Sequence, residues 1–122
     1  SKIGILHGAA AYCVQDADGQ INETESCSSG LDYPSCSAIH CLLKDVGRAR
    51  YTFATDEEAF SAYKLVTELE EISPSLEPSH SFAEAIKIAP RLDDTNIIVV
   101  NSCGDSLKDK DIIKKRLGSY SR

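Results

Sequence analysis

The sequence predicts an α/β fold, because segments with strand and helix patterns follow one another in the order strand, helix, helix, strand, helix. Two segments carry most of this prediction. A continuous β-branched run at 96–101 is typical of a strand buried on both faces of a parallel sheet. Thr55 and Glu58 have the spacing of a capping box, which predicts that a helix starts here. The apolar positions that follow at helical spacing are Ala59, Ala62, Tyr63, Val66 and Leu69.

In the first half of the chain, the apolar segment 3–15 predicts one or two short strands. An Asp-Gly pair predicts a turn at 16–19. Small residues dominate 26–34, as in loops that approach a ligand closely, although an ordinary surface loop fits equally well. The pattern at 37–44 predicts a short helix. Polar and apolar residues alternate at 50–54, which predicts a half-buried strand.

In the second half, two prolines predict that 71–78 is a connection. A helix is expected over 79–90 and a turn at 93–95. Residues 109–117 begin with acidic and end with basic residues, which suits a helix dipole, and Gly118 is a candidate C-cap.

The composition limits the class of protein. With 122 residues, 42% of them hydrophobic, we expect a single domain or a C-terminal piece of a larger chain. The net charge of -6 argues against nucleic acid as a partner. No apolar run approaches the roughly 20 residues of a membrane helix, so a soluble cytoplasmic protein is predicted, or a plastid one in a plant or alga. The first residue is not Met, which fits a piece of a longer polypeptide.

The five cysteines, an odd number without a CxxC pair, favour reduced thiols over a disulfide framework. Cys36, His40 and Cys41 form one loose cluster, which gives little support for zinc. His40 and His80 have no neighbour in sequence that would make a catalytic pair, and each fits a helix-end or packing role better than that of a base.

Three places could carry chemistry. The turn at 101–104 follows the predicted buried strand, where open parallel sheets bind ligands; the small side chains of Cys103 and Gly104 would admit a planar ligand, although such turns also occur without one. Asp32 could accept a hydrogen bond from a substrate hydroxyl or ammonium group, but a turn-forming role is more common. Glu77 lies just before the predicted helix and could simply cap it.

Short motifs across nearly the whole chain resemble the last third of the tryptophan synthase β chain, in the same order. They are Leu-His-Gly at 6–8, Gln-Asp-Ala-Asp-Gly-Gln-Ile at 15–21, Ser-Gly-Leu-Asp-Tyr-Pro at 29–34, Leu-Lys-Asp-Val-Gly-Arg-Ala at 43–49, Ala-Thr-Asp-Glu-Glu-Ala at 54–59, Pro-Ser-Leu-Glu at 74–77, Ser-His at 79–80 and Val-Val-Asn at 99–101. The resemblance implies part of a three-layer parallel-sheet domain, the type II fold of pyridoxal phosphate enzymes. It also implies the condensation of L-serine with indole to L-tryptophan.

Carried over residue by residue, the resemblance implies that Asp32 lies near the serine hydroxyl and that Glu77 lies close to the cofactor ring. Cys103 stands where the family usually has a serine that bonds the pyridine nitrogen, and a thiol is a weaker partner. Tyr33 and Ser35 match positions whose backbone carbonyls help to bind a monovalent cation.

The chain also departs from the family pattern. The loop at 34–40 loses two glycines, a proline and a glutamate, and the turn at 102–109 gains two residues and has Asp105 in place of an arginine. Glu71, Ser73 and Ser75 replace a glycine, an isoleucine and an alanine, which predicts a looser core contact there.

The family's Schiff-base lysine, its acid–base glutamate and its phosphate-binding loop are expected outside these residues, so the isolated chain should not be an enzyme. The expected partners are the remainder of a β-like chain, a second copy and a tryptophan synthase α subunit. The alternative is a noncatalytic remnant used for binding or oligomerisation.

Overall fold

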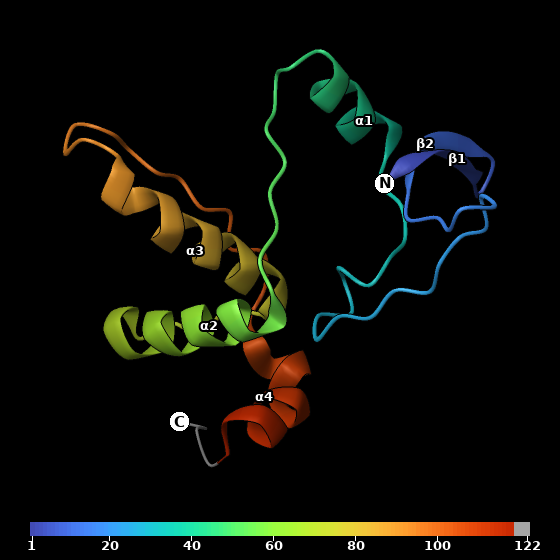
Figure 1. The fold of residues 1–122 in the computed structure, drawn as a ribbon. Coiled ribbons are helices and arrows are strands. Elements are labelled where there is room, and N and C mark those ends of the chain that lie inside the picture. Colours follow the sequence, from blue (N-terminus) through green and yellow to red (C-terminus); the bar gives the residue numbers. More distant parts are fainter. Residues whose placement is uncertain (119–122) are drawn as a thin grey trace. The chain divides into compact units, whose positions relative to one another are not determined.

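A computed structural model describes residues 1–118. The chain divides into two compact units (Figure 1). One comprises Ser1–Ser26 and Gly30–Tyr51, and the other comprises Cys27–Ser29 and the chain from Thr52 onwards. The α/β class is confirmed, with two strands and four α-helices among the described residues. The prediction of one domain or a C-terminal piece stays a prediction.

The first unit is built on a β-hairpin. Strands β1 (Lys2–Leu6) and β2 (Ala9–Cys13) pair in antiparallel fashion, which confirms the predicted short strands. His7 and Gly8 connect them with φ of 51° and 78°, and positive φ at both positions matches the twist of a hairpin. On β2, Ala11 and Cys13 point inward and are buried.

The rest of the first unit packs beside β2. The predicted turn at 16–19 is present, with Gly19 N donating to Asp16 O. Helix α1 (Ala38–Asp45) confirms the predicted short helix. Ser37, within the loop that departs from the family pattern, caps α1 by accepting a hydrogen bond from His40 N.

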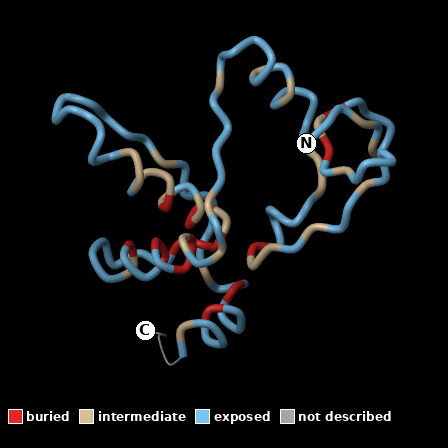
Figure 2. Tube along the Cα trace, in the orientation of Figure 1, coloured by how far each residue is buried: buried red, intermediate tan, exposed pale blue. Residues whose placement is uncertain are grey.

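The second unit is helical. Helix α2 (Asp56–Glu70) packs against α3 (Leu76–Ile88), and a short 3₁₀ turn, η2 (Ser106–Asp109), leads into α4 (Lys110–Leu117). Another 3₁₀ turn, η1 (Ala89–Arg91), ends α3. Phe60, Tyr63, Leu76 and Ile113 form the core, and the buried positions in Figure 2 lie mainly on these helices.

The capping box of α2 is confirmed, since Thr55 accepts from Glu58 N and Glu58 accepts from Thr55 N. Ala59, Ala62, Tyr63 and Val66 are buried as expected, but Leu69 is 69% exposed because it lies near the end of α2, beyond the packed part. Lys87 on α3 donates to Glu58 at 2.7 Å, and this bond, with the backbone N–H of Thr55, lowers the pKa of Glu58.

One expected helix start and two expected strands were wrong. Helix α3 begins at Leu76 rather than 79, because Pro78 occupies its first turn, where a backbone N–H has no helical partner to lose. Residues 50–54 and 96–101 are not strands: Phe53 is 82% exposed, and Ile97 and Val99 are each 88% exposed. Neither segment pairs with another strand within the described residues. Without a neighbouring strand, their backbone groups cannot form the hydrogen bonds of a sheet.

Glu71 provides a test of backbone strain. It ends α2 with φ 58°, a left-handed conformation that glycine adopts without the penalty paid by other residues. We expect Glu71→Gly to raise the free energy of unfolding by about 0.5 kcal/mol. Glycine relieves the strain of the left-handed backbone, which costs about 1 kcal/mol. Part of this gain is lost because glycine also gives the unfolded chain more conformational freedom. The neighbouring change Glu70→Gly, inside α2, should instead lower it by about 0.5–1 kcal/mol. Urea unfolding that gave both changes the same sign would contradict this account.

Candidate functional site

The predicted residues Glu77, Cys103 and Gly104 lie in one part of the second unit. Ser75 joins them: its backbone N donates to Gly104 O at 3.2 Å and its hydroxyl donates to Cys103 O at 3.3 Å. Glu77 follows two residues later, in the first turn of α3. The start of α3 and the turn at 103–105 are therefore held side by side by backbone and hydroxyl hydrogen bonds.

Gly104 has a conformation that favours glycine. Its φ is 107°, and a Cβ added there would lie 3.4 Å from the hydroxyl oxygen of Ser75. The side chain of the neighbouring Cys103 is exposed. Glycine at 104 therefore allows the close approach of Ser75, while the turn exposes the small thiol of Cys103.

Glu77 is held by Lys108. The Lys108 ammonium lies 2.9 Å and 2.8 Å from the two carboxylate oxygens of Glu77 and 2.8 Å from Asp109 Oδ1. Asp109 is only 4% exposed, and its second oxygen accepts from Leu76 N at 2.9 Å. Desolvation of the ammonium opposes a rise in the pKa of Lys108, but its bonds to Asp109 and Glu77 outweigh it and the pKa is raised. Lys108 stays charged and fixes the orientation of Glu77.

Two residues flagged as departures from the family have structural roles. Asp105 accepts from Leu107 N at 2.8 Å and caps η2. Ser75 is fully buried and is the N-cap residue of α3. Its hydroxyl donates to Cys103 O, so the polar group that it brings into the core has a partner. The looser core contact expected for this segment stays a prediction.

The other predicted residues belong to the first unit. Asp32 lies on an exposed loop and accepts from the Thr24 hydroxyl at 2.8 Å. The Tyr33 hydroxyl bonds His7 Nδ1 at 2.8 Å. The Ser35 hydroxyl donates to Tyr12 O at 3.1 Å and lies 3.3 Å from the Cys13 thiol. These contacts fix the loop that carries all three residues.

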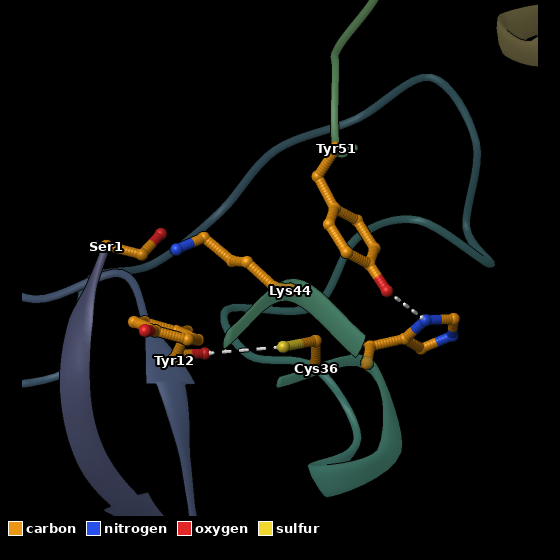
Figure 3. Close-up of a pocket in the computed structure, with 6 residues that line it drawn as sticks. Ser1, Tyr12, Cys36, Lys44 and Tyr51 are labelled. Carbon is orange, nitrogen blue, oxygen red and sulfur yellow. Dashed lines mark hydrogen bonds between the residues drawn. The ribbon is translucent and has the colours of Figure 1, made fainter. Parts of the chain in front are cut away.

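A pocket of about 400 Å³ in the first unit was not predicted from the sequence (Figure 3). His40 Nδ1 and the Tyr51 hydroxyl are 2.9 Å apart at one side, and the Lys44 ammonium lies 4.3 Å from the centre of the Tyr12 ring. Its lining residues come from separate segments of the chain; they are Ser1, Tyr12, Cys36, His40, Lys44 and Tyr51. No sequence motif joins these segments, which is why the pocket was missed.

The cysteines carry free thiols, with Cys36 and Cys41 Sγ 3.5 Å apart. A further group of potential metal ligands, formed by Cys27, Asp56 and His80, was also missed from the sequence. Among the described helices, none is both long and apolar enough to cross a membrane.

Comparison with known proteins found close relatives in sequence. The chain is 52% identical over 115 residues to the tryptophan synthase beta chain of Cereibacter sphaeroides, covering 94% of this chain and 28% of the relative. It is 50% identical over 115 residues to that of Roseobacter denitrificans, with the same coverage. It is 46% identical over 117 residues to that of Bordetella petrii, covering 96% of this chain and 29% of the relative. No family model matches the chain. The chain thus spans little more than a quarter of the length of these relatives.

Proposed function

This chain is homologous to the C-terminal portion of tryptophan synthase beta chains, and from that relationship we propose that it forms part of an enzyme that makes L-tryptophan from L-serine and indole. The identity of 45–52% over nearly the whole chain supports the proposal. The lysine that carries pyridoxal phosphate would come from the part of the beta chain that these residues do not cover. The isolated chain would then be inactive.

The contact between the start of α3 and the turn at 103–105 carries the cofactor proposal. Pyridoxal phosphate, when bound, withdraws electrons from the substrate and so allows serine to lose its hydroxyl. Cys103 and Gly104 would suit a flat ring, because both residues are small and exposed. The thiol would face the ring nitrogen as a weak, uncharged partner. Glu77, oriented by Lys108, would lie beside the ring.

For the loop of the first unit, described by itself, we propose a role in substrate binding. Asp32 would accept the hydrogen bond of the serine hydroxyl, while the Thr24 hydroxyl donates to the other side of the carboxylate and orients it. The backbone carbonyls of Tyr33 and Ser35 would bind a monovalent cation. The hydrogen bonds of these two side chains to His7 and Tyr12 support this role, because they order the backbone that carries the carbonyls.

The exposed apolar segments support a larger sheet. Although 96–101 forms no strand in this structure, its apolar side chains Ile97 and Val99 are each 88% exposed, which supports a partner that covers this segment. We propose that the remainder of the beta chain completes a three-layer parallel sheet here. A second copy and a tryptophan synthase α subunit are the further proposed partners, and a cytoplasmic location remains a prediction.

The alternative is a noncatalytic module, which Asp105 favours, since it puts a negative charge where the family has an arginine beside the cofactor.

The full polypeptide that carries these residues should be supplied with pyridoxal phosphate, L-serine and indole, and tryptophan measured by chromatography. Tryptophan formation together with the visible absorbance of bound cofactor is the expected result. Cofactor binding without product, or no cofactor binding, would overturn the proposed activity in favour of the module.

A further inference from the structure

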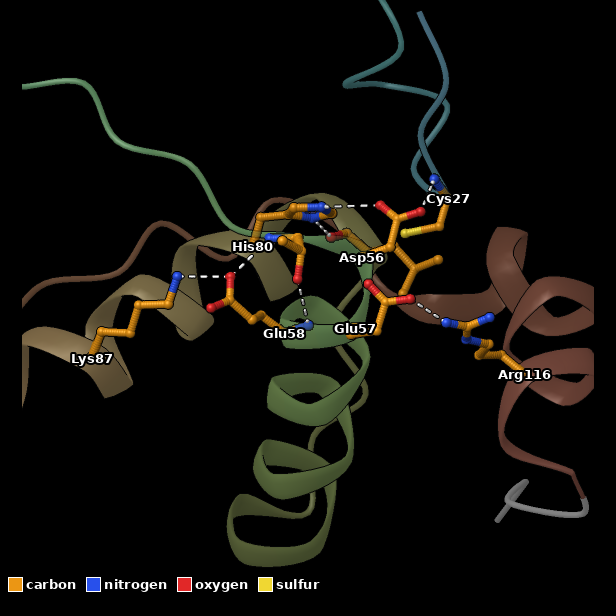
Figure 4. Close-up of polar contacts among 9 residues, drawn as sticks. Cys27, Asp56, Glu57, Glu58, His80, Lys87 and Arg116 are labelled. Carbon is orange, nitrogen blue, oxygen red and sulfur yellow. Dashed lines mark hydrogen bonds and ion pairs between the residues drawn. The ribbon is translucent and has the colours of Figure 1, made fainter.

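Three side chains with metal-binding atoms converge in the second unit (Figure 4). Cys27 comes from the short segment 27–29, Asp56 is the first residue of α2, and His80 lies in the second turn of α3. Their thiol, carboxylate and imidazole ligand atoms all lie within 4.8 Å of one another, and each residue is partly buried. The residues are far apart in sequence, so the fold alone brings them together.

His80 has the hydrogen-bond arrangement of a metal ligand. Its Nδ1 lies 2.7 Å from the backbone oxygen of Leu76, and because a carbonyl can only accept, Nδ1 must carry the proton. In the neutral ring this leaves the lone pair on Nε2, which faces Asp56 Oδ1 at 3.8 Å, too far for a hydrogen bond. A backbone carbonyl that fixes the tautomer in this way is typical of metal-binding histidines.

Asp56 is also oriented. Its Oδ2 accepts from the backbone N of Cys27 at 3.1 Å, so the carboxylate is fixed between Cys27 and His80. Burial and the hydrogen bond to Asp56, with additional charge effects from Asp56 and Asp109, raise the pKa of the Cys27 thiol to about 12. Independently of that pKa, the nearby carboxylates of Asp56 and Asp109 would attract a cation.

We propose that Cys27, Asp56 and His80 bind a divalent metal ion of the zinc type. A thiolate, an imidazole and a carboxylate are the ligands that zinc takes, with water in the fourth position. Tetrahedral bonds of the usual lengths place ligand atoms roughly 3.3–3.6 Å apart. Side-chain rotations that shorten the present separations by about 1 Å would therefore suffice. Binding exchanges the thiol proton for the metal and releases that proton to water. The inference does not depend on the proposed tryptophan synthesis.

The test uses Co²⁺ and Zn²⁺ on the full polypeptide, purified free of metal under reducing conditions. We expect one Co²⁺ per chain with a thiolate-to-cobalt charge-transfer band, which Zn²⁺ then displaces. Cys27→Ser should abolish the band, and His80→Gln and Asp56→Asn should each weaken binding by at least the roughly 10-fold that loss of even an outer-shell partner causes. The circular dichroism of each variant without metal checks that it is folded.

The first unit offers a matched control, because Cys36, His40 and Cys41 also combine thiols with an imidazole. Cys36→Ser and His40→Gln should leave the band and the affinity unchanged. A band that survives Cys27→Ser, or that is lost in Cys36→Ser, would overturn the proposal, as would the absence of any band. Should the variants not fold, imidazole NMR of the unaltered protein decides: Zn²⁺ must shift Nε2 of His80 while Nδ1 stays protonated.

Discussion

Replacing Leu76 with alanine should lower the free energy of unfolding of the second unit by about 3 kcal/mol. Leu76 is fully buried and packs with Phe60, Tyr63 and Ile113, so its removal leaves a cavity among three helices. Leu76 is also where α3 starts, beside Glu77, so the same cavity would loosen the position of that carboxylate. Urea unfolding followed by circular dichroism measures the change.

Leu69→Ala is the matched control for this prediction. It removes the same atoms from α2, where Leu69 is 69% exposed, and should change the free energy of unfolding by no more than about 0.5 kcal/mol. Equal losses in the two variants would mean that the core does not lie where Leu76 is packed. A large loss in Leu69→Ala alone would point to an additional partner covering the end of α2.

The helices could be predicted because their determinants are local. Thr55 and Glu58 cap α2 through residues three positions apart, and the burial of Ala59 and Val66 follows from helical spacing alone. Leu69 shows the limit of this reasoning: spacing places it on the same face, but only the tertiary structure decides how far that face is covered.

The strands were predicted less well because pairing is not local. The hairpin of β1 and β2 has its partner within a few residues, and it was found. Residues 50–54 and 96–101 have strand patterns but no strand beside them among the described residues, so they stay extended and exposed. Under the proposed larger sheet, their neighbours would belong to the part of the beta chain that these residues do not cover.

Some residues of the candidate sites could also be predicted from the sequence, and others could not. Glu77, Cys103 and Gly104 were selected from position and family resemblance, and hydrogen bonds of Ser75 bring their segments together. Lys108, which orients Glu77, was missed because nothing in a sequence marks which lysine reaches which carboxylate. The Cys27, Asp56 and His80 cluster was missed for the same reason, since its members meet only after α2 and α3 have packed.

Asp32→Asn should lower kcat/KM for serine by roughly 100-fold in the complete enzyme, as expected for a group that holds a proton in the reaction. The amide has the size of the carboxylate and can still accept the Thr24 hydroxyl, so the loop should keep its structure. What is lost is the negative charge that, in the proposed role, would accept the hydrogen bond of the serine hydroxyl. Steady-state kinetics with serine varied at saturating indole measures the effect, and a loss in kcat rather than a rise in KM identifies a role in the reaction itself.

Asp18→Asn is the control, because it removes the same charge from an exposed turn of the same unit and should leave kcat/KM unchanged. An equal loss in both variants would assign the effect to the net charge of this unit. An active Asp32→Asn enzyme would exclude the carboxylate from the reaction while leaving tryptophan synthesis itself intact. The experiment can therefore exclude the role of Asp32 without excluding the proposed function. Tryptophan synthesis requires only that the unaltered protein makes tryptophan.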